Sequence, residues 1–291
     1  MTRVVELTEP PRLSRLYAGA LRPSRSQRPP ELPDVELVLA EVTVDRARLG
    51  AYDRVCGFRL TDTLPPTYPH VLAFPLHLQL MTDDAFPFAA AGMVHIRNVI
   101  TTTGRLDAGV PLTIRVRAQR LAPHPKGAQL DLVADVSAGG APVWTSRSTY
   151  LSRGASLRDV TPDRTPSRAE APHAADLSER QAATWRVGKD VGRRYARVSG
   201  DVNPIHLHPL GARLFGFRGP IAHGMWTKAR CLAALQARLP DALTVDVSFQ
   251  KPLPLGSTVR FLAREDPTGW EFGVLPATDD RAHLSGSVRA A

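Results

Sequence analysis

The chain of 291 residues repeats one order of predicted elements, and this repeat constrains its fold more than any other feature. Each half opens with a strand, continues through helices and ends with four segments in which apolar and polar residues alternate. Such alternation, with turn residues between the segments, is typical of antiparallel strands. A strand, helices and then four strands predict an α+β fold in which an antiparallel sheet wraps around one helix.

The two halves also align at two places. Tyr52 to Cys56-Gly57 has the spacing of Tyr195 to Ser199-Gly200, and Ala73-Phe74-Pro75 aligns with Ala222-His223-Gly224 at the head of a central helix. The alignment predicts a tandem repeat of diverged sequence. The predicted strands are residues 35–44, 93–101, 111–118, 129–137 and 143–151, then 183–187, 244–250, 258–264, 269–274 and 283–288.

A polar, proline-containing stretch, residues 153–178, separates the halves. A structureless loop of about 20 residues is uncommon inside a compact domain, so we assign this stretch to a linker. The two units are then residues 34–152 and 179–291. Residues 1–33 are predicted to form an N-terminal arm, with apolar residues at helical spacing from Leu13 to Leu21.

Composition excludes several classes of protein. The net charge is +9, but no dense Lys/Arg run with interleaved aromatic residues is present, so nucleic acid is not the expected partner. Two cysteines, Cys56 and Cys231, cannot build a disulfide framework or a cysteine-based zinc site, which favours a reducing compartment. The longest uncharged stretch, residues 63–82, contains four prolines and predicts no membrane span. The arm lacks the apolar core of a secretory signal, so we expect a cytoplasmic protein.

The segment from Tyr195 to His206 is the most informative one for chemistry. Helical periodicity stops at Gly200, and Asn203-Pro204 predicts a turn. Asp201 and His206 can converge across that turn on one small site. A carboxylate and a group that titrates near neutrality together suit acid–base chemistry at carbon. Taken as a pair alone, Asp201 could instead cap the turn and His206 could be a core histidine.

A second segment, Gly219-Pro220 to Gly224-Met225, leads into an apolar helical run that ends at Leu239. A glycine in the first turn of a helix lets a ligand approach backbone N–H groups that have no partner within the helix. Such N–H groups suit a developing oxyanion. The alternative is an ordinary entry into a helix, with glycine required for packing.

Together the two segments resemble the MaoC-like family of (R)-specific enoyl-thioester hydratases and 3-hydroxyacyl-thioester dehydratases. The resemblance rests on Tyr195…Ser199-Gly200-Asp201-Val202-Asn203-Pro204-Ile205-His206, followed by Phe215-Gly216 and Ile221-Ala222-His223-Gly224-Met225. Motifs in the first half extend it over nearly the whole chain: Thr67-Tyr68-Pro69, Phe74-Pro75, Phe86-Pro87-Phe88-Ala89-Ala90 and Gly92-Met93-Val94-His95.

The resemblance implies a double hot-dog fold, in which two antiparallel sheets each wrap around a central helix. It implies reversible dehydration of (3R)-hydroxyacyl thioesters of coenzyme A or acyl carrier protein to trans-2-enoyl thioesters, without a cofactor or a metal. Asp201 and His206 would be the catalytic pair, and the Gly224 N–H would bind the thioester oxygen. The supporting residues would be Tyr195, Ser199, Asn203 and His223.

The first half departs from this pattern at every catalytic position. In the alignment Phe58 stands where Asp201 does, Thr63 where His206 does, and Pro75, which has no N–H, where Gly224 does. We therefore expect the first half to be a wall without chemistry. By analogy with the family, the loss of its site and of part of its helix would make room for a medium or long acyl chain.

Several alternatives stay open at this point. His206 is assigned as the base toward the α-carbon and Asp201 as the group that holds and protonates the leaving hydroxyl, but the roles can be exchanged or shared through one water. Arg218 is a candidate contact for a phosphate of the substrate, or an exposed structural residue. The chain could instead be a hot-dog thioesterase, or a non-catalytic acyl-thioester-binding subunit of a heteromeric dehydratase. It would act as a monomeric pseudo-dimer or as a homodimer.

Overall fold

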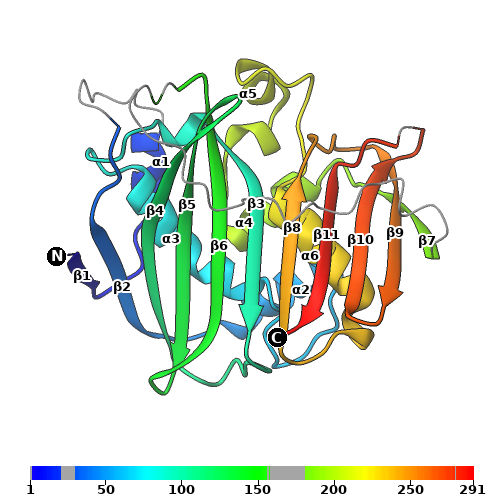
Figure 1. Cartoon of the computed structure of the whole chain (residues 1–291), viewed down its shortest axis with the longest axis horizontal. Helices are drawn as coiled ribbons and strands as arrows, with labels where there is room; N and C mark the ends of the chain where they lie inside the picture. The colour runs from blue at the N-terminus through cyan, green and yellow to red at the C-terminus, as the bar shows by residue number, and fades with distance from the viewer. Residues whose placement is uncertain (1, 21–29, 156, 158–180, 279) are drawn as a thin grey trace.

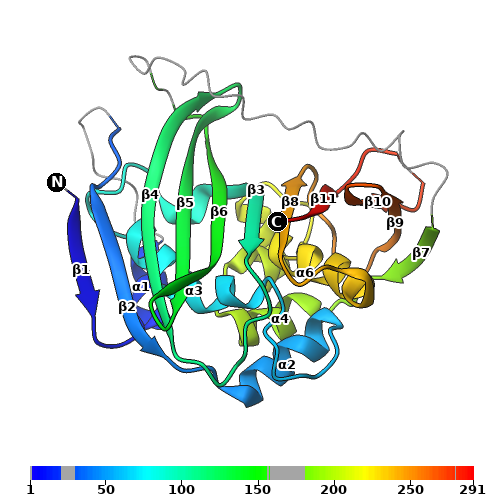
Figure 2. The same cartoon turned by 60° about the horizontal axis from the view of Figure 1, so that its bottom comes forward.

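Eleven strands form one continuous sheet, and the central helices lie against one of its faces (Figures 1 and 2). The computed structural model describes residues 2–20, 30–155, 157, 181–278 and 280–291. The strand order is β1-β2-β4-β5-β6-β3-β8-β11-β10-β9-β7. Most of the predicted linker, from residue 158 to 178, lies outside the described residues.

The first unit contains the predicted strand, helices and four strands in that order. Its elements are β2 (Val35–Val42), α2 (Arg46–Cys56), α3 (Tyr68–Met81), β3 (Met93–Thr102), β4 (Leu112–His124), β5 (Gly127–Ala138) and β6 (Ala141–Arg153). The second unit repeats the order, with an additional short helix before its central helix. Its elements are β7 (Gln181–Arg186), α4 (Val191–Ser199), α5 (Pro209–Leu214), α6 (Gly224–Leu235), β8 (Leu243–Phe249), β9 (Thr258–Asp266), β10 (Gly269–Pro276) and β11 (Leu284–Ala290). The α+β double hot-dog prediction is confirmed, with the two sheets joined edge to edge.

The join is the antiparallel pairing of β3 with β8, from Arg97↔Ser248 to Thr102↔Leu243. Arg97 and Asp246 form an ion pair across it, and the hydroxyls of Thr101 and Thr244 lie 2.9 Å apart. Charge pairs and threonine pairs between facing residues stabilise neighbouring strands. The two units therefore share one sheet rather than packing as separate domains.

The repeat is visible in the backbone at the ends of α2 and α4. Each helix ends at a glycine in the left-handed conformation, Gly57 with φ 86° and Gly200 with φ 82°. Glycine reaches this region without the steric cost that a Cβ adds. The predicted equivalence of Gly57 and Gly200 therefore has a structural basis.

The prediction for the head of the first central helix is wrong. α3 begins at Tyr68, with Pro69 in its first turn, and Pro75 lies inside the helix. Proline fits the first turn, where its missing N–H has no partner to lose. With 14 residues α3 is longer than α6 with 12, so the first unit has not lost part of its helix. The segment between the helices differs instead: it spans residues 57–67 in the first unit and 200–223 in the second.

The N-terminal arm is built into this fold. β1 (Arg3–Leu7) pairs in parallel with β2 at the edge of the sheet, and α1 (Leu13–Ala20) packs beside α3. The sequence predicts the helix but not the strand. No helix in the described part of the chain is both long and apolar enough to cross a membrane.

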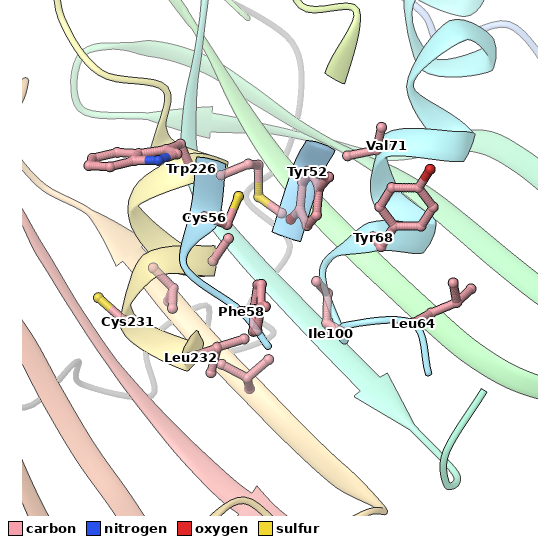
Figure 3. Packing of buried hydrophobic residues seen from close by; sticks show 14 of the residues in the cluster. Tyr52, Cys56, Phe58, Leu64, Tyr68, Val71, Ile100, Trp226, Cys231 and Leu232 are labelled. Carbon is pink, nitrogen blue, oxygen red and sulfur yellow. The ribbon is translucent and has the colours of Figure 1, made fainter. Parts of the chain in front are cut away.

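A hydrophobic core runs through both units. Figure 3 shows Cys56 and Phe58 of the first unit beside Trp226 and Leu232 of the second. The indole N–H of Trp226 donates to the Val55 carbonyl at 3.0 Å, which links α6 to α2. Because side chains of both units fill one core, neither unit keeps its packing without the other.

α3 carries a buried histidine with no hydrogen-bond partner in the described part of the chain. His77 is completely buried, neither ring nitrogen is bonded, and its ring lies 5.3 Å from that of His70. Burial lowers the pKa of His77 from 6.5 to about 4. A histidine that stays neutral when folded binds its proton more readily in the unfolded chain.

We therefore expect the free energy of unfolding to fall as the pH drops from 6.5 toward 4, with the contribution of His77 fully present above pH 6.5. Between pH 7.5 and 5.5, His77 should account for ~1 kcal/mol of this loss. Urea titrations of the wild type and His77→Leu at both pH values test this. Leu80→Val, in the same helix, should keep the wild-type pH dependence; an equal dependence in His77→Leu would contradict the assignment.

Candidate active site

A cavity of about 540 Å³ lies between α3 of the first unit and the segment that precedes α6 in the second. One face of α3 supplies apolar side chains at helical spacing: Val71, Phe74, Leu78 and Met81. The second unit lines the cavity with all seven residues that the sequence predicts for the site: Tyr195, Ser199, Asp201, Asn203, His206, His223 and Gly224. The cavity thus brings these polar groups of the second unit opposite an apolar face of α3, and further polar and apolar side chains of both units complete its lining.

Asp201 stands where α4 ends. After the left-handed Gly200, its N–H donates to the Ser199 hydroxyl at 3.1 Å, and its Oδ1 accepts the Asn203 N–H at 3.2 Å. The Asn203 side chain in turn caps the short helical turn η3 (Pro204–His206) by accepting the Ile205 N–H at 3.3 Å. These hydrogen bonds stabilise the turn that Gly200 and Asn203-Pro204 predict.

His206 closes that turn with its ring held in one orientation. Its Nδ1 lies 2.8 Å from the Ile221 carbonyl oxygen. A carbonyl oxygen only accepts, so Nδ1 carries the proton and the lone pair of the neutral ring is on Nε2. Burial lowers the pKa of His206. The Asp201 carboxylate and the hydrogen bond to Ile221 raise it, but burial has the larger effect.

His223 is the residue immediately before α6, and it contacts both His206 and Asp201. Its ring is 3.7 Å from that of His206 and 4.9 Å from that of Tyr195. Its Nε2 donates to the Asp201 carbonyl at 2.9 Å and lies 3.8 Å from Asp201 Oδ2. Burial and the nearby His206 lower the pKa of His223 to about 3, so this ring is neutral.

The Asp201 carboxyl is 28 % exposed and lines the cavity. Burial raises its pKa, but His223, His206 and hydrogen bonds from the Asn203 N–H and the Tyr17 hydroxyl bring it below 3.8. The carboxyl is therefore ionised near neutral pH. The site holds a carboxylate beside a neutral imidazole whose Nε2 can accept a proton.

Gly224 is the first residue of α6, and its N-cap, His223, makes no side-chain capping bond. The positive end of the helix dipole is therefore at the cavity wall. A Cβ at Gly224 would lie 3.0 Å from the Phe249 ring, a tight contact that supports the packing interpretation. The role of the Gly224 N–H toward an oxyanion stays a prediction.

Phe74, which aligns with His223, lines the cavity, but the residues aligned with Asp201 and His206 lie elsewhere. Phe58 is buried in the core and stacks on Tyr52, and Thr63 pairs with Asp107 in a single bridge. Neither lines the cavity, and neither does the exposed Arg218.

Sequence analysis missed residues that reach the cavity from other elements. Tyr17 of α1 contacts the Asp201 carboxylate, and His95 and Tyr150 stack on each other at 4.6 Å in the cavity wall. Lys126, Arg153 and Lys251 also line it. No short-range pattern identifies them as a group, because they come from α1, β3, β6 and the loops after β4 and β8.

The side-chain atoms of Asp201, His206 and His223 that could bind a metal lie within 4.8 Å of one another. Nδ1 of His206 and Nε2 of His223 each donate to a backbone carbonyl, so only Nε2 of His206 and Nδ1 of His223 have a lone pair that could bind a metal. The expectation of a reaction without a metal stays a prediction.

Comparisons with known proteins agree with this geometry. Residues 168–267 match the family model described as "MaoC like domain". The chain is 36% identical over 277 residues to the 3-hydroxyacyl-thioester dehydratase X of Mycobacterium tuberculosis, covering 95% of this chain and 96% of that protein. It superimposes on a crystal structure of that protein, HtdX, with a TM-score of 0.77, 35% identity, and coverage of 88% of this chain and 100% of the other.

The fold is also shared with more distant proteins. A MaoC-like dehydratase from Phytophthora capsici has a TM-score of 0.72 at 21% identity, covering 88% of this chain and 95% of the other. At this level of identity the likeness concerns the fold alone.

Gly192 of α4 gives a test of how the site is held. A Cβ at Gly192 would collide with the carbonyl oxygen of His206, so α4 and η3 can approach only because this residue is glycine. Gly192→Ala should destabilise the protein by about 1–3 kcal/mol, since the two backbones must separate. Thermal unfolding measures the loss. Gly219→Ala, where a Cβ meets nothing within 4 Å, is the control and should keep the wild-type Tm; an unchanged Tm in Gly192→Ala would contradict the close approach.

Proposed function

This chain belongs to the MaoC-like dehydratase family, and we propose that it removes water from (3R)-3-hydroxyacyl thioesters with Asp201 and His206 as its catalytic pair. Its activity is that of a 3-hydroxyacyl-thioester dehydratase, a hydro-lyase. One observation carries the assignment of the pair: an ionised carboxylate and a neutral imidazole with a free Nε2 line the same cavity as the head of α6.

The α-hydrogen beside a thioester is weakly acidic, so its removal needs a base and stabilisation of the enolate-like oxygen together. His206 Nε2 takes the α-proton. The N–H of Gly224, at the positive end of α6, binds the thioester oxygen as negative charge develops on it. His223 stays neutral and holds the Asp201 backbone through its Nε2–H.

The lowered pKa of Asp201 disfavours the proton-donor role that the sequence analysis assigned to it, so we propose that His206 makes both proton transfers. The carboxylate accepts a hydrogen bond from the 3-hydroxyl of the substrate. As the C–O bond breaks, the imidazolium of His206 returns its proton to the leaving hydroxide, and water forms. In the reverse direction the carboxylate orients the attacking water, so no proton is left over in either direction.

The acyl chain lies along the apolar face of α3, and we expect medium or long chains. Each methylene buried there stabilises the complex by about 0.8 kcal/mol. The support for this is the stripe of four apolar side chains that α3 presents to the cavity, Val71, Phe74, Leu78 and Met81.

The carrier of the thioester is coenzyme A or acyl carrier protein. Both bring phosphate, and the carrier protein adds an acidic surface. Lys126, Arg153 and Lys251 line the cavity and are better placed than Arg218 to meet these charges. The free, buried cysteines Cys56 and Cys231 fit the predicted cytoplasmic location.

Asp201→Asn and His206→Ala should each lower kcat for hydration of a trans-2-enoyl-CoA by ~10²-fold or more, because the first removes the charged acceptor that orients the water and the second removes the base. Circular dichroism checks that both variants fold. Thr63→Ala, at the aligned position of the first unit, is the matched control and should keep turnover. Near-native rates in either variant would contradict the pair, and release of free thiol without enoyl formation would indicate a thioesterase. Binding without turnover at any chain length would indicate a passive subunit.

Leu78→Ala should shift the preferred substrate to longer chains, because it lengthens or widens the cavity beside α3. The shift is measured as kcat/KM over a series of enoyl-CoA substrates from about four to sixteen carbons. Each added methylene that is buried should stabilise the complex by ~0.8 kcal/mol. Leu76→Ala is the control. Leu76 is buried in the core and does not line the cavity, so this variant should have a lower Tm but the same preferred acyl-chain length as the wild type. A strict preference for four carbons in the wild type would contradict the long-chain proposal and leave the chemistry intact.

A further inference from the structure

The N-terminal arm places a phenol on the catalytic carboxylate. The hydroxyl of Tyr17, in α1, lies 3.1 Å from Asp201 Oδ1 and 3.3 Å from the Gly200 carbonyl, and it accepts the Val202 N–H at 2.9 Å. Its single proton goes to the nearer acceptor, Asp201 Oδ1, and its oxygen accepts the Val202 N–H, so Tyr17 bonds to the residues at which the chain turns away from α4. It is more than 180 positions from them in the sequence.

The arm is anchored where it makes these bonds. Leu13 of α1 packs so closely over Gly200 that a Cβ there would collide with it. Leu13, Leu16 and Tyr17 also pack against the apolar cluster that contains Phe74 and Tyr150. The parallel pairing of β1 with β2 fixes the chain that leads into α1. The position of the phenol is thus set by packing and strand pairing, not by the single hydroxyl.

The phenol acts on the carboxylate as a donor that does not ionise. Burial and the adjacent carboxylate raise the pKa of Tyr17, so it keeps its proton throughout the working range. A hydrogen bond to the charged form of an acid stabilises that form. The other titratable groups that influence or border Asp201 come from five further elements: His95 (β3), Tyr150 (β6), Tyr195 (α4), His206 (η3) and His223 (before α6).

We propose that Tyr17 is a positioning residue for the dehydration reaction: the arm delivers its hydroxyl to Oδ1 of Asp201 and fixes the rotation of the carboxylate. This inference rests on the proposed function, in which that carboxylate meets the 3-hydroxyl of the substrate. The N-terminal arm is accordingly part of the active site rather than a cover over it.

Tyr17→Phe removes the hydroxyl and keeps the ring and its packing. It should lower kcat for hydration of a short enoyl-CoA about tenfold or more, because a hydrogen bond to a charged group is lost. KM should change little, since the substitution removes only the hydroxyl and keeps the ring that lines the cavity. The pKa of the Asp201 carboxyl, followed by NMR, should rise by about one unit, because a carboxylate without this hydrogen bond is protonated more easily.

Leu13→Ala separates this role from simple coverage. It loosens the packing of the arm over Gly200 and should lower Tm, but it should shift the Asp201 pKa less than Tyr17→Phe does, because the hydroxyl is retained and Leu16 and the β1–β2 pairing still hold the arm. A wild-type kcat and a wild-type Asp201 pKa in Tyr17→Phe would overturn the proposal, and so would an equal shift of that pKa in Leu13→Ala. Absence of turnover in the wild type is a different result and would contradict the proposed function itself. If Tyr17→Phe fails to fold, Tyr17→Leu gives the same test: it also removes the hydroxyl, so it should raise the Asp201 pKa and lower kcat, and wild-type values of both would overturn the proposal.

Discussion

The antiparallel pairing of β3 with β8 is the interaction on which the rest of the structure depends. It turns two hot-dog sheets into one, and a buried lysine of α6 reinforces it. The ammonium of Lys228 donates to the Asn98 carbonyl at 3.0 Å, to its side-chain oxygen at 2.6 Å and to the Val245 carbonyl at 3.1 Å. Asn98 is on β3 and Val245 on β8, so one side chain ties α6 to both central strands. A buried cation is costly unless its donors are satisfied, and here three acceptors meet it.

The joined sheet places chemistry and substrate binding in different units. The head of α6 and the turn after α4 supply the polar groups, whereas α3 supplies an apolar wall from the other unit. The division follows from the segments that precede the central helices. Residues 200–223 are long enough to carry the turn η3 and the helix α5, whereas residues 57–67 run directly to α3 and put Phe58 into the core. The first unit thus keeps the whole fold and lacks only the segment that carries the catalytic groups.

The catalytic turn is held from several directions. Gly192 lets α4 approach the backbone of His206, His223 bonds to the Asp201 carbonyl, and Tyr17 approaches from the arm. The orientations of Asp201 and His206 therefore depend on contacts from α4, from α1 and from the residue before α6. A site held this way needs little rearrangement when the substrate binds, which is how preorganised polar groups stabilise a transition state.

Local signals in the sequence determined most of the elements and the identity of the second unit's site residues. Alternation of apolar and polar residues located ten strands, and the glycines at 57 and 200 and the Asn203-Pro204 turn marked real changes of backbone direction. These features act over a few residues, so a few residues reveal them. The sequence analysis placed the start of the first central helix at Pro75 instead of Tyr68. A proline can stand in the first turn of a helix or at a kink, and the sequence alone did not show that Pro69 stands in the first turn of α3 and Pro75 in its interior. Tertiary structure alone decided the β3–β8 join, the parallel β1, the tautomer of His206 and the contact of Tyr17 with Asp201. Each of these depends on groups far apart in the chain, and no short-range pattern encodes which of them will meet.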